Sequence, residues 1–195
     1  MLQKLAEIGY FIEDEQALVT EIREGNQKAW DAVTKVLYTP LFYFVNRMVS
    51  NTEIAEELVQ DVFVNFWLKR KNLNITSSLK AYLYRAARNH TLNFIKRRQF
   101  ERDYQEKLAQ ELILQTNDTE DAFHFSELEK QLSHAIENLP DNCKEIFKLS
   151  RYEEMTYKEI AEVLDIPTRS VHYQIGLALK ELRVKLKGYV STGML

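Results

Sequence analysis

The chain has 195 residues, of which 26 are basic, 29 are acidic and 45% are apolar, so it is long enough for one or two packed domains. Five glycines and three prolines provide few turns for an all-β fold, and no alternation of strand-like and helix-like segments is visible, so we expect an all-α protein. No apolar run approaches the roughly 18 residues of a membrane span and no signal-peptide pattern opens the chain, so we expect no insertion into a membrane. The single cysteine, Cys143, cannot form an internal disulfide, which fits a reducing cytoplasm, and we expect a buried structural thiol.

Three helices are predicted before residue 70. The first covers residues 14–24 and ends at a glycine, a common C-terminal signal. The second covers residues 26–49, with apolar residues at helical spacing, and Pro40 should kink or split it. Residues 50–53, Ser-Asn-Thr-Glu, have the spacing of a capping box, which predicts that a third helix begins at Ser50 and reaches Lys69.

Two neighbouring segments differ sharply in charge. Residues 51–68 hold four acidic residues and no basic one, whereas residues 69–98 hold nine Lys or Arg residues and no acidic one. Ser77 or Ser78 is predicted to cap a fourth helix that carries most of these cations.

An acidic connection follows the basic segment. Residues 99–125 are predicted to continue the fourth helix and then to decay into a polar, flexible linker, because such a composition buries too little apolar surface to order the chain. The charge distribution therefore indicates two helical bundles with different tasks, residues 1–98 and residues 126–195, joined by the acidic linker 99–125.

The second bundle contains the most specific local pattern of the chain. Thr156 and Glu159 form a capping box, and residues 165–167, Asp-Ile-Pro, provide a tight turn between two short helices. Two helices with such a turn are typical of a helix-turn-helix, whose second helix enters the major groove of DNA. A plain helical hairpin is the alternative interpretation.

The second helix of this motif has one face free of apolar core residues. Arg, Gln and Ser side chains can read base edges, and a lysine can hold a phosphate. The candidate DNA-contacting residues of this helix are Arg169, Ser170, His172, Tyr173, Gln174 and Lys180.

Two separated segments resemble one known family. "AEELVQDVFVNFW" and "LKAYLYRAARNHTLNFIKRR", residues 55–67 and 79–98, resemble the promoter-melting domain of bacterial sigma factors. "AIENLPDNCKEIFKLSRYEEMTYKEIAEVLDIPTRSVHYQIGLALKELR", residues 135–183, resembles their C-terminal helix-turn-helix domain. With only a short linker between the two, the chain is similar to the extracytoplasmic-function (ECF) group of the sigma-70 family.

The resemblance implies a task for each charged segment. The acidic helix would bind the β′ clamp helices of core RNA polymerase through Glu56, Glu57, Gln60 and Asp61. The basic segment would capture the non-template strand of the minus-10 element, with Leu73 walling a pocket for a flipped base and Asn89 reading a base. The residues implied at the minus-10 element are Lys71, Leu73, Arg85, Arg88, Asn89, Asn93, Lys96 and Arg97. An acid in that groove would repel the phosphates of a separated strand, which explains thirty residues without one.

The resemblance also implies the role of the helix-turn-helix, which would read the minus-35 element through the six candidates given above. Many members of the family place several cations on this helix, whereas this chain has residues such as His172, Tyr173 and Gln174 there, so we expect weak binding to free DNA. Core polymerase, through its β′ clamp helices and its β flap, and promoter DNA are the implied partners. An anti-sigma factor is a further candidate partner that the sequence does not identify.

Two other functions compete with that of a sigma factor. A free-standing helix-turn-helix regulator with a helical effector domain would bind duplex DNA without polymerase. A hydrolase or metal enzyme is disfavoured because the four histidines are scattered and no metal-ligand or phosphate-loop spacing exists. We therefore expect a non-enzymatic cytoplasmic protein, without a cofactor or metal, that directs promoter recognition, DNA melting and transcription initiation.

Overall fold

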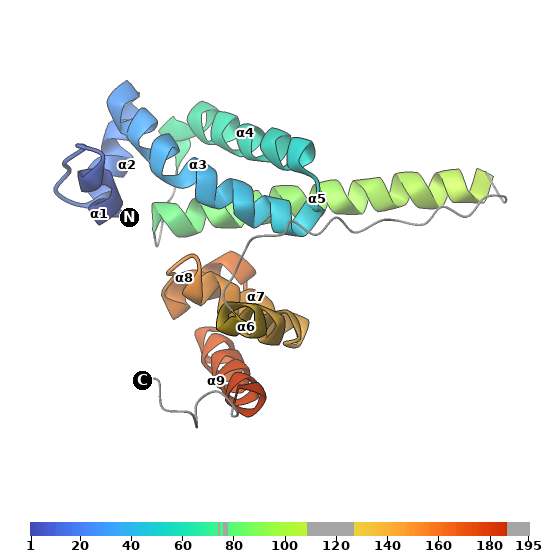
Figure 1. The fold of residues 1–195 in the computed structure, drawn as a ribbon. Coiled ribbons are helices and arrows are strands. Elements are labelled where there is room, and N and C mark those ends of the chain that lie inside the picture. The colour runs from blue at the N-terminus through green and yellow to red at the C-terminus, as the bar shows by residue number, and fades with distance from the viewer. Residues whose placement is uncertain (74, 76–77, 109–126, 187–195) are drawn as a thin grey trace. The chain divides into compact units, whose positions relative to one another are not determined.

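The computed structural model describes residues 1–73, 75, 78–108 and 127–186, and every regular element in these ranges is helical (Figure 1). The chain divides into two compact units, Met1–Ala109 and Gln110–Leu195. The elements of the first unit are α1 (Leu2–Glu7), α2 (Glu15–Glu24), α3 (Gln27–Val49), α4 (Thr52–Leu68), the 3-10 turn η1 (Arg70–Asn72) and α5 (Leu79–Leu108). Those of the second are α6 (Glu127–Glu137), α7 (Asp141–Arg151), α8 (Tyr157–Leu164) and α9 (Thr168–Lys185). The predicted all-α class with two helical bundles is confirmed.

The first predicted helix is confirmed as α2. The Asp14 side chain accepts a hydrogen bond from the backbone N–H of Ala17 at 2.7 Å, and Gly25 ends the helix at φ 86°. The short helix α1 precedes it and is absent from the sequence-based prediction. It has six residues and buries only Leu5, so its apolar pattern is too short to be recognised.

Helix α3 matches the second predicted helix, and Pro40 does not split it. Proline removes one backbone donor and normally breaks a helix. Here Leu37 and Leu41, on either side of Pro40, are both buried in the bundle, so packing holds both halves of α3 in helical conformation.

The predicted capping box at the start of α4 is wrong. Ser50 ends α3 in the left-handed region, at φ 49°, and Asn51 is the residue that caps α4. The Asn51 side chain accepts a hydrogen bond from the N–H of Ile54 at 2.9 Å. Asparagine is as good a cap as serine, so local spacing alone could not separate the two registers.

Helix α5 begins as predicted and continues past the basic segment. Ser78 is its cap, since its hydroxyl accepts a hydrogen bond from the N–H of Ala81 at 3.1 Å, while Ser77 lies outside the described residues. The helix runs to Leu108, so the first ten residues of the proposed linker are helical, in agreement with the predicted extension. Figure 1 shows α5 extending beyond the ends of α3 and α4. The rest of the linker lies outside the described residues.

Aromatic side chains join α3 to its neighbours in the core of the first unit. The Trp30 ring lies 5.8 Å from Phe63 and 5.0 Å from Trp67, both on α4. The Phe44 ring lies 5.1 Å from Tyr84 of α5, which is fully buried. Tyr84 is therefore a core residue, and α4 and α5 are both held against α3 so that their outer faces are fixed relative to each other.

The second unit contains the predicted helix-turn-helix as α8 and α9. The capping box at Thr156 and Glu159 is present in both directions, and Asp165 ends α8 in the left-handed region at φ 55°. Val171, Ile175 and Ala178 of α9 are buried in the unit. Among the described helices of the chain, none is long and apolar enough to cross a membrane.

Candidate polymerase and DNA interfaces

The residues predicted to bind polymerase lie together on the exposed face of α4. Its core side is formed by residues such as Leu58, Val59 and Val62. The exposed side chains include the four predicted ones, Glu56, Glu57, Gln60 and Asp61. Burial of one side of a regular helix places these three acids and Gln60 in solvent on the other side.

Two apolar residues extend this face, and the sequence analysis missed them. Val64 is 55% exposed and Leu68 is 69% exposed. They follow Glu57 and Asp61 at spacings of three and four residues, so the four side chains form one stripe along α4. Helical spacing could have revealed them, because both positions fall outside the buried stripe.

One side chain of α5 reaches this face. The His90 Nε2 atom lies 3.2 Å from Asp61 Oδ2, so the two predicted interaction helices touch through a residue that is not among the predicted site residues. Its signal in sequence is weak, since a single histidine without spaced partners indicates no particular role.

The predicted minus-10 residues of α5 occupy the outer face of that helix. Its buried positions include Leu83, Tyr84, Ala87 and Thr91. The exposed residues are Arg85, Asn89, Asn93, Lys96 and Arg97, while Arg88 is half-buried and Lys71 is exposed on η1. The structure thus brings cationic and amide side chains together along α5, as a surface for a polyanion requires.

Leu73 differs from its predicted environment. Its side chain is only 5% exposed, and its carbonyl oxygen accepts a hydrogen bond from the Arg23 guanidinium of α2. In this structure Leu73 belongs to the core of the first unit, so its side chain can contact a base only after leaving that packing.

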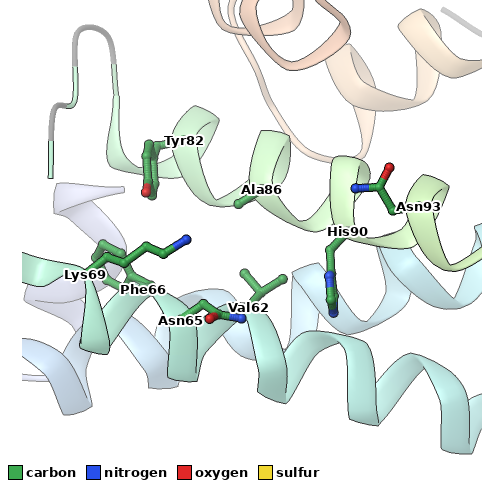
Figure 2. Close-up of a pocket in the computed structure, with 8 residues that line it drawn as sticks. All are labelled: Val62, Asn65, Phe66, Lys69, Tyr82, Ala86, His90 and Asn93. Atoms are coloured by element: carbon green, nitrogen blue, oxygen red, sulfur yellow. The ribbon is translucent and has the colours of Figure 1, made fainter.

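A pocket of about 270 Å³ opens between α4 and α5 (Figure 2). Figure 2 shows one wall formed by α4 and the other by α5. The lining residues are Val62, Asn65, Phe66, Lys69, Tyr82, Ala86, His90 and Asn93. Burial raises the pKa of the Tyr82 hydroxyl. Aromatic rings, amides and an ammonium group are the groups that stack on, hydrogen-bond to and neutralise nucleotides.

The predicted minus-35 residues lie on α9, and most of them are exposed. Arg169, Tyr173 and Lys180 follow one another on one face, with Tyr173 66% exposed. His172 is exposed and its ring meets the Tyr157 ring edge-on at 4.6 Å, while Ser170 is half-buried. This face also contains Gly176, where an added Cβ would meet nothing within 4 Å.

Gln174 is engaged inside the second unit. The Cys143 thiol of α7 donates to the Gln174 amide oxygen at 2.8 Å, so this side chain helps to join α7 and α9. Cys143 is buried, as predicted, and burial, with a further contribution from Glu181, raises the pKa of its thiol. Within the described part of the chain, no group of three or more His, Cys, Asp or Glu residues could hold a metal ion.

Family models match both units. The model for Sigma-70 region 2 matches residues 34–101 and the model for Sigma-70, region 4 matches residues 129–182, and together they cover more than half of the chain. The Bacillus subtilis ECF RNA polymerase sigma factor SigW is 23% identical over 177 residues, which cover 87% of this chain and 95% of that protein. The ECF RNA polymerase sigma-E factor of Haemophilus influenzae is 25% identical over 181 residues, with 89% and 95% covered.

Solved structures share the fold. CnrH, solved in complex with the cytosolic domain of CnrY, matches with a TM-score of 0.60 at 19% identity, over 89% of this chain and 97% of that one. The sigma factor RpoE from Bartonella quintana, solved with the anti-sigma factor NepR, also matches with a TM-score of 0.60, at 20% identity, over 82% and 98%. The two family regions, in the order and spacing predicted, and the full-length relatives lead to one conclusion: the chain belongs to the ECF group of the sigma-70 family of bacterial RNA polymerase sigma factors.

Proposed function

We propose that this sigma factor binds core RNA polymerase through the exposed face of α4, the minus-10 element through α5 and the minus-35 element through α9. As a member of its family it directs promoter-specific transcription initiation. The observation that carries the residue assignment is that two neighbouring helices have outer faces of opposite charge. The α4 face is acidic and apolar, whereas the α5 face is cationic.

The α4 face suits a helical protein partner. Glu57, Asp61, Val64 and Leu68 form one stripe, and alternating spacings of three and four residues match the seam of a pair of packed helices. The apolar end offers burial, and the acidic end offers charge pairing that selects a cationic partner and speeds its encounter. The β′ clamp helices of polymerase are the proposed partner.

The α5 face suits a separated DNA strand. Arg85, Lys96 and Arg97 attract phosphates, and Asn89, exposed on the same helix, can hydrogen-bond to a base edge. Leu73 would join this site only if its side chain left the core, so its role as the wall of a base pocket depends on a local rearrangement during DNA capture.

The α9 face suits duplex DNA. Arg169 and Tyr173 are exposed where a recognition helix meets base edges, and Lys180 is placed for a phosphate. This division of labour corresponds to proposed domains at residues 1–98 and 126–195, with the linker 99–125 between them.

Membership of the family and the matched structures support four further proposals. The chain acts without catalysis of its own, and it acts in the cytoplasm, where its polymerase is. The β flap of polymerase is the proposed partner of the second domain. The matched structures of CnrH and RpoE each contain a partner protein, and the partner of RpoE is the anti-sigma factor NepR, so an anti-sigma factor is proposed here as well.

Glu57→Lys tests the α4 assignment. Reversing this charge should weaken binding to core polymerase by about ten- to a hundredfold, because a charge buried without its partner in an interface is costly. Affinity is measured by fluorescence anisotropy with core polymerase from the same bacterium, followed by promoter-specific run-off transcription. Glu24→Lys, an exposed acid reversed on α2, is the matched control and should bind normally. Unchanged affinity in Glu57→Lys, with circular dichroism showing an intact helical fold, would contradict the assignment.

A further inference from the structure

We propose that α2 positions the minus-10 binding region, with Glu15 and Arg23 as positioning residues. The inference rests on the proposed role of Leu73 and α5 in capturing the separated strand. It comes from two hydrogen bonds that connect the two ends of α2 to the two residues bounding positions 74–78. Arg23 donates to the carbonyl of Leu73, and Glu15 accepts from the backbone N–H of Leu79.

The C-terminal end of α2 is attached to the end of η1. Beside the bond from Arg23 to Leu73, the Arg70 guanidinium packs close to Gly25, where an added Cβ would lie 3.7 Å from Arg70 Nε. Arg70 in turn donates to the Trp67 carbonyl at 2.9 Å and lies over the Trp67 ring at 4.2 Å. The chain leaving α4 is therefore held against the end of α2.

The N-terminal end of α2 is attached to the start of α5. The N–H of Leu79 belongs to the first turn of α5, where backbone donors have no partner within the helix. The Glu15 carboxylate accepts it, while Ser78 accepts from Ala81. A negative charge at this end also interacts favourably with the helix dipole. A residue 64 positions earlier in the chain thus caps the helix that is proposed to hold the DNA strand.

The rigidity of α2 sets the separation of these attachments. Glu15 and Arg23 are eight residues apart, which is about 12 Å along a helix. A six-residue step, such as the one from Leu73 to Leu79, can span up to about 20 Å, so chain connectivity by itself does not determine that separation. Leu18, Val19 and Ile22 of α2 are buried, which anchors the helix to the core. The two hydrogen bonds therefore transmit a fixed geometry from the core to the backbone of Leu73, whose side chain can still move, and to the start of α5.

The position of Glu15 supports a specific task. The segment 69–98 contains no acid, yet an acid from elsewhere in the chain lies at the start of its helix. An unpaired carboxylate there would repel DNA phosphates. Here the Glu15 carboxylate accepts a hydrogen bond from Leu79 and so caps α5. The ordered start of α5 offsets the repulsion between this acid and the proposed DNA strand.

Substitutions of Glu15 separate its hydrogen bond from its charge. Glu15→Gln and Glu15→Ala both remove the charge, but only Gln retains an oxygen that can accept from Leu79. At the other end, Arg23→Met removes the donor and keeps much of the aliphatic stem. Gln16→Ala and Glu24→Ala, exposed neighbours on α2, are the matched controls. One hydrogen bond is a small part of the stability of a domain, so the variants should fold and bind core polymerase normally.

The measurement is the base preference of the reconstituted holoenzyme on a single-stranded DNA library randomised over the non-template positions of the minus-10 element. Glu15→Ala and Arg23→Met should each lower the ratio of preferred to disfavoured base at one or two positions by about three- to tenfold, as expected for loss of one hydrogen bond. Glu15→Gln and both controls should stay close to the wild-type ratio.

Several outcomes would overturn the inference. A wild-type preference in both Glu15→Ala and Arg23→Met would show that α2 does not position the site. If base preference fell as far in Glu15→Gln as in Glu15→Ala, the charge of Glu15 would be responsible and not its hydrogen bond to Leu79. Uniform weakening in Arg23→Met with a flatter salt dependence would make Arg23 a phosphate contact. A wild-type holoenzyme without any minus-10 preference would instead refute the proposed role of α5 itself, and the inference with it.

Discussion

Gly25, in the left-handed region, ends α2 one residue before the cap of α3. Its φ of 86° ends α2, and its N–H closes back onto the last turn, while Asn26 begins α3 by accepting hydrogen bonds from Lys28 and Ala29. Only glycine adopts this backbone without a steric penalty. The angle between α2 and α3, and with it the placement of Arg23 beside Leu73, depends on this residue.

Gly25→Ala should destabilise the first unit by about 1 kcal/mol, because the added Cβ makes the left-handed backbone unfavourable. The nearest atoms to that Cβ lie at 3.7 Å, so the cost is one of backbone strain and not of collision. Both tryptophans of the chain, Trp30 and Trp67, lie in this unit, so the urea midpoint of tryptophan fluorescence reports it specifically.

Gly176→Ala is the control for that experiment. This glycine lies within α9, in the second unit, and an added Cβ meets nothing within 4 Å. The tryptophan transition should stay where it is in the wild type. An unchanged midpoint in Gly25→Ala as well would mean that the left-handed turn contributes little to the packing of α2.

Among single elements, α9 contains both exposed and half-buried side chains at its predicted DNA-contacting positions. Tyr173 is exposed, whereas its neighbour Gln174 is half-buried and accepts a hydrogen bond from Cys143. Both are predicted to read the minus-35 element. The structure gives Gln174 a second task, because its amide also joins α9 to α7.

Tyr173→Ala and Gln174→Ala should therefore differ in their effects. Tyr173→Ala should change base preference at one or two minus-35 positions, since a good base contact is worth roughly 1–3 kcal/mol of discrimination. Gln174→Ala should lower the stability of the second unit by about 1 kcal/mol, the usual net value of a lost hydrogen bond. Holoenzyme binding to a minus-35 library and thermal unfolding by circular dichroism measure the two effects. A stable Gln174→Ala protein with altered base preference would show that Gln174 reads DNA instead.

Helix α5 combines cations that attract phosphates with amides, such as Asn89, that can read a base. Asn89→Ala should slow open-complex formation and relax preference at one minus-10 position, whereas Arg85→Ala should weaken all promoters alike and lower the salt dependence by about one phosphate contact. Stopped-flow kinetics on duplex and pre-melted templates measures both. Pre-melted DNA should restore the rate of Asn89→Ala if the fault lies in strand separation. Equal loss on every minus-10 sequence would reduce Asn89 to a packing or phosphate-holding residue.

At the scale of the whole molecule, charge argues for a protein that needs polymerase to bind DNA. The chain has a formal net charge of −3, and the outward face of α9 contains only Arg169 and Lys180 as cations over positions 168–180. Most of the affinity of a free DNA-binding protein comes from phosphate neutralisation. Tethering to polymerase would supply the missing affinity by raising the effective concentration of α9 near the promoter.

The free full-length chain should therefore bind duplex promoter DNA with a Kd weaker than about 1 μM at physiological salt, as in non-specific binding. The holoenzyme should bind the same duplex with clear sequence preference. Fluorescence anisotropy across a salt series, with and without core polymerase, measures both. Nanomolar, sequence-specific binding by the free chain would favour the free-standing regulator over the polymerase-dependent mode.

Features set by residues close together in the chain could be predicted from the sequence. Apolar spacing predicts α3, α4 and α5, Gly25 predicts the end of α2, and the capping box at Thr156 and Glu159 follows from neighbours within one helical turn. The burial of Cys143 follows on the same basis, from its place in an amphipathic helix. Two motifs in the right order were enough to identify the family, because each motif is local.

Features that join residues far apart in the chain depend on the folded structure. The pair Asp61–His90, the bond from Cys143 to Gln174 and the bond from Glu15 to Leu79 connect positions 29, 31 and 64 residues apart. No periodic pattern encodes such contacts, since they depend on how helices pack. The burial of Leu73 and the choice of Asn51 over Ser50 as a cap are likewise outcomes of packing. Local patterns in the sequence predict most of the helices and the family, whereas packing decides which side chains those helices expose to solvent.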